Sequence, residues 1–309
     1  MTGAVPNPLN DPTAVALTAG DLEAVFLPGH GMLGISLRRQ GIEFLRQIDD
    51  LKTAATSGAV AGIPLLFPWA NRLAGFRYEA AGRTVTLPQH SPLMRYDNNG
   101  LPMHGMPWPH LTWTIVERAA SRLIARLDWS SAEHLSVFPY PCRLLMTASL
   151  DGNGLTIETA LTATGGAAVP VSFGFHPYLG LPELSREDWR VHIPPMRHLA
   201  LDPSKIPTGA AEPFGGLEDA LGDRDFDDGF ALLGDRVTLS VAGGGWRVSV
   251  DLLDDYPYAQ VYAPRGHNYL AFEPMTAPSN ALVSGKGLHL AEPGGTFRAA
   301  FRIRIGADT

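Results

Sequence analysis

Hydrophobic and polar residues alternate near the C-terminal end of the chain, a period of two that is typical of a β-strand with one buried face. The two sets here are Phe297, Ala299, Phe301, Ile303 and Ile305 against Arg298, Ala300, Arg302 and Arg304. The same alternation covers 246–252, directly after three consecutive glycines, and appears on both sides of the turn residues 151–154. Each of these two arrangements predicts a β-hairpin. No long stretch with helical periodicity accompanies them.

Turn-forming residues also indicate many short strands. The chain has 33 Gly and 26 Pro among 309 residues, spread along its length instead of gathered in a linker. Antiparallel strands with alternating faces favour sheets packed face to face, so we expect an all-β fold. A chain of this length can bury a large core, and we expect a single domain over residues 1–309. The segment from Glu218 to Asp235, rich in Gly and Asp, is expected to be a loop.

The charge balance and the termini limit the classes of partner. The formal net charge is -7 and the basic residues are scattered, so we expect neither nucleic acid nor an anionic membrane surface as a partner. The longest apolar stretch, 59–70, is interrupted by Pro64 and Pro68 and is far shorter than the roughly 20 residues of a membrane span. The N-terminus shows no secretory signal, and the one cysteine, Cys142, fits a reducing compartment. We therefore expect a cytoplasmic protein.

Four segments place polar or ionisable residues in apolar or turn-forming surroundings, where burial would shift their pKa values. An apolar run at 62–70 ends in Asn71 and Arg72, whose guanidinium could form paired hydrogen bonds with sugar hydroxyls or a carboxylate. Equally, Arg72 could be a surface arginine that follows a buried strand. A stiff loop with an Asn-Gly turn and two prolines holds His104, which suits either proton transfer or a structural role in the turn.

The other two segments carry an imidazole and a carboxylate among apolar residues. His176 lies between aromatic residues in 171–181 and could be a general acid or a core histidine bonded to backbone. Glu273 ends a strand-like run before Pro274, and a carboxylate there is costly unless it is functional or paired with an arginine. Asp227 and Asp228 could belong to an ordinary acidic loop.

Taken together and in this order, these segments resemble the aldose 1-epimerase (galactose mutarotase) family, from about Gly62 to Asn280. The resembling parts are the Asn-Arg pair, the Asn-Gly to His-Gly loop, the His-Pro-Tyr turn, the Asp-rich segment and the Glu-Pro-Met-Thr end. The resemblance implies a β-supersandwich of antiparallel sheets, galactose mutarotase-like, that binds a monosaccharide in an open cleft. It also implies that the α and β anomers of an aldose are interconverted without a metal or organic cofactor.

The resemblance further implies a role for each matching residue. Glu273 is expected to be the base that takes the proton of the anomeric hydroxyl, and His176 the acid that protonates the ring oxygen. His104 is expected to assist that acid, as the third catalytic residue. Arg72 and Asp227 would hold the other hydroxyls, with Asn71 and Tyr178 as further substrate-binding residues. Asp227 is preferred to Asp228 because it stands three residues before Phe230.

Two departures from the family pattern leave the sugar open. Met106 stands where many members have a second Gly, and Pro177 stands where the galactose-acting branch commonly has Thr. A hexose-6-phosphate 1-epimerase is one alternative; it would need a cationic subsite, for which Arg46, Arg77 or Arg95 are candidates. A second alternative is a sugar-binding module without catalysis.

A third alternative makes the same polar residues metal ligands. His104, His176, Asp227 and Glu273 would suit zinc or iron, although no closely spaced histidine pair anchors such a site. The expected protein has no metal or cofactor and is a monomer or homodimer.

Overall fold

The computed structural model describes residues 11–48, 50–51 and 61–308. Residues 1–10, on which the prediction about a secretory signal depends, and residues 59–60 of the longest apolar stretch lie outside the described residues. Within the described residues, no helix has both the length and the apolar character needed to cross a bilayer.

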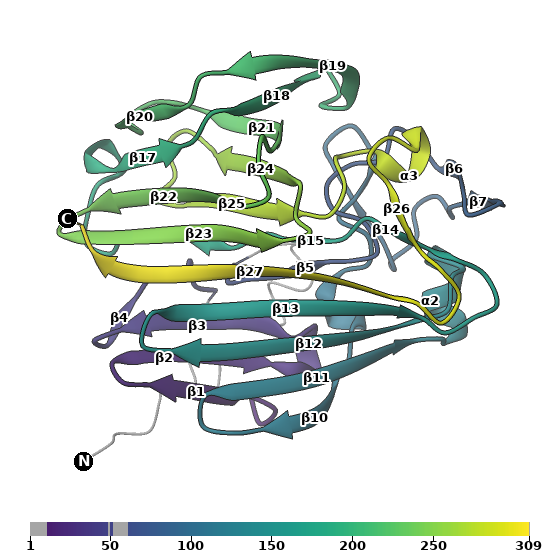
Figure 1. Cartoon of the computed structure of the whole chain (residues 1–309), viewed down its shortest axis with the longest axis horizontal. Helices are drawn as coiled ribbons and strands as arrows, with labels where there is room; N and C mark the ends of the chain where they lie inside the picture. The colour runs from purple at the N-terminus through teal and green to yellow at the C-terminus, as the bar shows by residue number, and fades with distance from the viewer. Residues whose placement is uncertain (1–10, 49, 52–60, 309) are drawn as a thin grey trace.

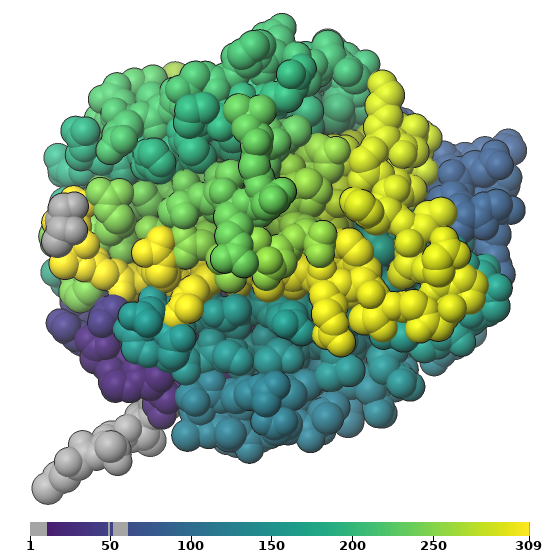
Figure 2. Space-filling model, viewed as in Figure 1, coloured from purple at the N-terminus to yellow at the C-terminus, as the bar shows by residue number. Residues whose placement is uncertain are grey.

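The largest sheet has nine antiparallel strands and forms the front layer in Figure 1. In spatial order its strands are β10 (Thr114–Arg118), β11 (Arg122–Trp129), β12 (Cys142–Asp151), β13 (Gly154–Ala163), β27 (Thr296–Ala307), β23 (Trp246–Asp254), β22 (Val237–Gly243), β17 (Arg190–Ile193) and β20 (Leu217–Ala220). The C-terminal strand β27 therefore lies in the middle of this sheet. Figure 2 shows it (yellow) with the teal strands β12 and β13 below it and the green strands β22 and β23 above it.

A second sheet of eight strands lies behind the first (Figure 1). Its order is β19 (Pro207–Phe214), β18 (Met196–Leu201), β21 (Phe226–Ala231), β24 (Tyr258–Ala263), β25 (Leu270–Met275), β15 (Gly174–Phe175) and β5 (Leu65–Leu66), and β16 (Tyr178–Leu179) also pairs with β25. Every pair in this sheet is antiparallel as well.

The remaining elements are short. A four-stranded sheet contains β1 (Val15–Ala19), β2 (Leu22–Leu27), β3 (Leu33–Arg39) and β4 (Ile42–Glu43). Three two-stranded ribbons pair β6 (Arg77–Ala80) with β7 (Arg83–Thr86), β8 (Arg95–Tyr96) with β9 (Pro102–Met103), and β14 (Val169–Val171) with β26 (His289–Ala291). The labelled α-helices are α2 (Ala132–Val137) and α3 (Ala281–Ser284), and single 3-10 turns occur at Pro28–His30, Trp108–His110 and Arg186–Asp188.

Aromatic side chains join the two large sheets into one core. Phe175 of β15 and Phe301 of β27 have ring centroids 5.0 Å apart, and the ring of Tyr256 lies 5.9 Å from that of Phe301. Both phenylalanines are 0–1% exposed and belong to one hydrophobic cluster with residues of both sheets. The apolar face of each sheet is therefore buried against the other, which is the arrangement that strand alternation predicts.

The all-β prediction and both hairpins are confirmed. β12 pairs with β13, and β22 with β23, around the predicted turns. The loop predicted for 218–235 is wrong, because much of it is strand: β20 ends at Ala220, and β21 pairs with both β18 and β24. The two acidic residues in β21 suggest a solvated loop when only the sequence is considered. In the structure neither needs exposure to bulk water, because Asp228 forms an ion pair with His198 and Asp227 faces a pocket.

Candidate active site

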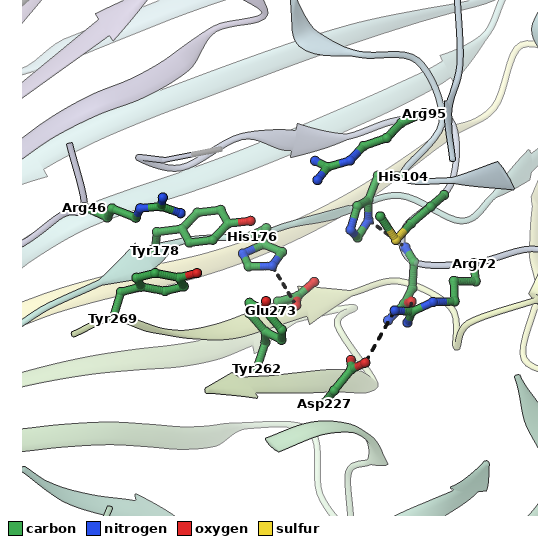
Figure 3. Close-up of a pocket in the computed structure, with 12 residues that line it drawn as sticks. Arg46, Arg72, Arg95, His104, His176, Tyr178, Asp227, Tyr262, Tyr269 and Glu273 are labelled. Carbon is green, nitrogen blue, oxygen red and sulfur yellow. Dashed lines mark hydrogen bonds and ion pairs between the residues drawn. The ribbon is translucent and has the colours of Figure 1, made fainter. Parts of the chain in front are cut away.

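A pocket of about 280 Å³ lies on the eight-stranded sheet, on the face that points away from the core (Figure 3). Its lining residues come from segments far apart in the sequence: Arg46, Asn71, Arg72, Arg95, Met103, His104, His176, Tyr178, Asp227, Tyr262, Tyr269 and Glu273. The volume suits a ligand the size of a monosaccharide better than a large cofactor. Most of the lining side chains are polar or aromatic, as expected for a site that binds hydroxyl groups.

Strand register places the acidic residues in this pocket. In β25 successive side chains point to opposite faces, so Phe272 enters the core while Glu273 points into the pocket. Glu273 lies opposite Gln260 of β24, and two residues further along that strand Tyr262 lies opposite Asp227 of β21. Three neighbouring strands therefore bring residues 227, 262 and 273 to the same face of the sheet.

His176 is fixed between β15 and β16 by backbone contacts. Its amide donates to the carbonyl of Pro64 over 3.1 Å, and the amide of Tyr178 donates to the carbonyl of Gly62 over 2.8 Å. The Tyr178 ring stacks on the imidazole with centroids 4.0 Å apart and an angle of 14°. This packing holds His176 Nε2 at 3.2 Å from Glu273 Oε1, and both side chains are almost fully buried.

His104 reaches the pocket on a loop that is locked to Asn71. The His104 amide donates to the Asn71 carbonyl over 2.9 Å, and the Asn71 amide donates to His104 Nδ1 over 3.1 Å. Because Nδ1 accepts a hydrogen bond, the hydrogen of the neutral ring is on Nε2. Gly105 allows the loop to pass close to the backbone of Phe67: its φ is +64°, and a Cβ there would lie 2.3 Å from the Phe67 carbonyl oxygen. The ring centroids of His104 and His176 are 5.9 Å apart.

Arg72 is held by three oxygen acceptors. Its Nε donates to Asp97 over 3.0 Å, its Nη1 to the side-chain oxygen of Asn71 over 3.0 Å, and its Nη2 to Asp227 over 3.4 Å. Asp227 also accepts a hydrogen bond from Gln260 over 2.8 Å. The guanidinium is therefore held in one orientation before any ligand binds. Its hydrogen bonds also fix the side chains of Asp227 and Asn71.

Burial shifts the proton affinities of the central groups in opposite directions. Burial, with the nearby charge of Asp227, raises the pKa of Glu273 well above its usual value. Burial, with the positive charge of Arg95, lowers the pKa of His176 to about 3. The same two causes, together with the charges of His176 and Arg72, hold the pKa of His104 well below its usual value. These shifts favour the uncharged form of all three groups: a protonated Glu273 carboxyl, a neutral His176 ring and a neutral His104 ring.

Two polar atoms of this pair have no hydrogen-bond partner within the part of the chain that the structure describes: Glu273 Oε2 and His176 Nδ1. A buried polar atom without a partner destabilises the fold by about 1–3 kcal/mol. Groups kept in such a state are candidates for function, because a structural role would be served better by a paired side chain.

The candidates from the sequence converge in this pocket. Its lining includes all three proposed catalytic residues and all four proposed substrate-binding residues: Glu273, His176, His104, Arg72, Asp227, Asn71 and Tyr178. Asp228 is not part of the lining; it pairs with His198 at 2.9 Å. Of the three arginines considered for a cationic subsite, Arg46 and Arg95 line the pocket, whereas Arg77 is exposed on β6.

Other residues of the site were not predicted from the sequence. Tyr262, Tyr269 and Met103 also line the pocket, and Asp97 and Gln260 position its polar groups. The only sequence signal for Asp97 is its place before an Asn-Asn-Gly turn, and it also accepts hydrogen bonds from the amides of Asn99 and Leu101 in that turn. Among the described residues, no three His, Cys, Asp or Glu side chains are grouped in a way that could hold a metal ion.

Two solved structures of galactose mutarotase relatives share this architecture. A galactose mutarotase-like protein from Clostridium acetobutylicum aligns with a TM-score of 0.82 at 19% identity, covering 95% of this chain and 95% of that chain. The GalM/aldose epimerase homologue from C. elegans aligns with a TM-score of 0.78 at 17% identity, covering 96% of this chain and 99% of that chain. At these identities the similarity shows the fold, which is the galactose mutarotase-like β-supersandwich.

Sequence comparison identifies the family. The aldose 1-epimerase family model matches residues 14–304. The uncharacterized protein YihR of Escherichia coli is 27% identical over 306 residues, which cover 94% of this chain and 92% of YihR. The chain belongs to the aldose 1-epimerase family.

Proposed function

We propose that this protein is an aldose 1-epimerase, an enzyme that interconverts the α and β anomers of an aldose by opening and reclosing the ring. The observation that carries the proposal is the contact between His176 Nε2 and Glu273 Oε1 at 3.2 Å, inside a pocket that His104 also lines. Family membership supports the same reaction class. Anomerisation needs one proton taken from O1 and one delivered to O5, so an acid and a base that share one proton are sufficient.

In the proposed reaction Glu273 removes the proton of the anomeric hydroxyl while His176 protonates the ring oxygen and the C1–O5 bond breaks. The products of this step are an open-chain aldehyde and a hydroxyl at C5. Rotation about C1–C2 presents the other face of the aldehyde, and closure with the two roles reversed gives the opposite anomer. Protons balance over the cycle, so the enzyme returns to its starting state.

The resting position of the shared proton adds one step. The raised pKa of Glu273 and the lowered pKa of His176 support a resting state in which this proton is on the carboxyl group. Its transfer across the 3.2 Å contact creates the carboxylate and imidazolium that the reaction uses. A sugar hydroxyl that donates to Glu273 Oε2 favours the charged carboxylate and so promotes this transfer.

His104 and Arg72 are proposed to hold the sugar in register with the proton-transfer pair. The neutral His104 ring has its hydrogen on Nε2, because Nδ1 accepts the Asn71 amide hydrogen bond. His104 therefore offers a donor for the ring oxygen or a neighbouring hydroxyl. Arg72, fixed by Asp97, together with Asp227 offers donors and acceptors for the remaining hydroxyls.

Polarimetry on freshly dissolved α-D-glucose, α-D-galactose and a panel of other aldoses tests the proposal after subtraction of the spontaneous rate. We expect acceleration with at least one aldose, and the variant Glu273→Gln to lose about two to four powers of ten in kcat/KM. Glu212→Gln, which changes an exposed carboxylate on the edge strand β19, is the matched control and should keep full activity. Sugar binding in calorimetry without acceleration of any aldose would instead identify a binding module.

A further inference from the structure

The three arginines that line the pocket differ in their partners. Arg72 is neutralised by Asp97 and Asp227. The guanidinium of Arg46 lies over the ring of Tyr269, 4.4 Å from its centroid. The guanidinium of Arg95 is half-buried and makes neither an ion pair nor a hydrogen bond with any residue in the described part of the chain.

Arg95 directs its charge at the catalytic groups. It lies on β8 and pairs with Met103 of β9. Met103 is the residue directly before His104. Figure 3 shows its guanidinium turned toward the rings of His104 and His176 and the hydroxyl of Tyr178. Its positive charge lowers the pKa of both histidines, so it acts on the interior of the pocket and not only on solvent.

The carboxylates of the site do not compensate Arg95. The positive charge that lowers the pKa of Glu273 is that of Arg72. Asp227 accepts hydrogen bonds from Arg72 and Gln260, and Asp97 accepts one from Arg72. A half-buried guanidinium without a counter-ion is unfavourable, and its fork of donors matches an oxyanion better than a neutral hydroxyl.

We propose that Arg95 is the centre of a subsite for an anionic substituent, so that the substrate is an aldose that carries a phosphate, sulfate or carboxylate group. Arg46, on the other side of Tyr178 in Figure 3, adds a second positive charge to the same pocket. The inference rests on the proposed epimerase function and names its substrate class.

The test compares kcat/KM for glucose with that for glucose 6-phosphate, glucose 6-sulfate and glucuronate, using exchange NMR to follow anomerisation. We expect the wild-type enzyme to prefer at least one of the charged sugars, and the three sugars distinguish phosphate, sulfate and carboxylate. Arg95→Met should lower the ratio of charged to neutral kcat/KM by about tenfold or more, because it removes charge-assisted hydrogen bonds. The ratio is the readout because loss of Arg95 also changes the histidine pKa values and hence the rate with every sugar.

The matched control is Arg77→Met, which removes an exposed arginine on β6 outside the pocket and should leave the ratio unchanged. A wild-type enzyme that prefers glucose to all three charged sugars, or an unchanged ratio in Arg95→Met, would overturn the subsite. If the enzyme accelerates the anomerisation of neutral sugars only, the subsite proposal is rejected and the epimerase proposal stands. If no sugar is accelerated, the epimerase proposal fails, and calorimetric binding of the charged sugars to the wild type and Arg95→Met decides on the subsite alone.

Discussion

Glu273 and His176 are proposed to share one proton, and this limits the pH range in which the pair can act. The reaction fails when the pair has two protons, because no base remains, and when it has none, because no acid remains. The second proton is gained only near the lowered pKa of His176, about 3. The last proton is lost only above the raised pKa of Glu273.

We therefore expect kcat/KM to stay level as the pH falls through 6.5, the value at which an unperturbed histidine titrates. Rates of anomerisation between about pH 5 and about pH 8, corrected for the spontaneous reaction, check this expectation. Glu212→Gln, which removes an exposed carboxylate outside the pocket, should give the same level profile. An acid limb centred near the ordinary histidine pKa would show that His176 titrates alone and would contradict the shared proton.

Individual site residues differ in how far the sequence reveals them. Glu273 and His176 are recognisable because an ionisable group among apolar residues requires an explanation. Asp97 and Gln260 give no such signal, because their importance comes from the partners that the fold brings to them, Arg72 and Asp227. Arg95 can be named as a candidate cation, but its lack of a counter-ion among the residues that the structure describes is a property of the pocket.

Among the strands, β15 controls the distance between the two catalytic groups. Gly174 pairs with Met275 of β25 on one side and with Leu66 of β5 on the other. A Cβ at Gly174 would lie 2.6 Å from the Pro274 carbonyl oxygen and 3.0 Å from Ala70 Cβ. The strand that leads to His176 can approach the strand of Glu273 this closely only because residue 174 has no side chain.

Gly174→Ala should push β15 away from β25 and disturb the His176–Glu273 contact. We expect a loss of about 1–3 kcal/mol in the free energy of unfolding and a clear fall in kcat at temperatures where the variant is still folded. Urea unfolding and polarimetry measure the two effects. Gly166→Ala is the matched control, because a Cβ at that exposed glycine meets nothing within 4 Å. Equal behaviour of the two variants would contradict the role of β15.

Strand prediction succeeded where alternation and turn residues agree, as in β12–β13 and β27. It failed at β21, because Asp227 and Asp228 suggest a solvated loop when read without their partners. In the structure Asp227 pairs with Arg72 and Asp228 with His198. Both contacts join residues far apart in the sequence, so no local pattern reports them.

At the scale of the whole molecule, the two large sheets share one core, to which Phe301 belongs. This side chain is fully buried on β27 and contacts Phe175 of β15 and Tyr256, so it joins the nine-stranded sheet to the sheet that holds the pocket. Phe175 directly precedes His176. Because neither sheet can bury its apolar face alone, we expect the chain to unfold as a single cooperative unit, as proposed for one domain over residues 1–309.

Phe301→Ala tests this coupling, because it removes contacts to both sheets at once. We expect a loss of about 3–5 kcal/mol in the free energy of unfolding, with tryptophan fluorescence and enzyme activity lost in the same urea transition. Leu233→Ala, a truncation at a side chain that is 65% exposed, should change stability by no more than about 0.5 kcal/mol. A variant that loses activity in one transition and fluorescence in a later one would show that the sheets unfold separately, and the single-domain proposal would then be wrong.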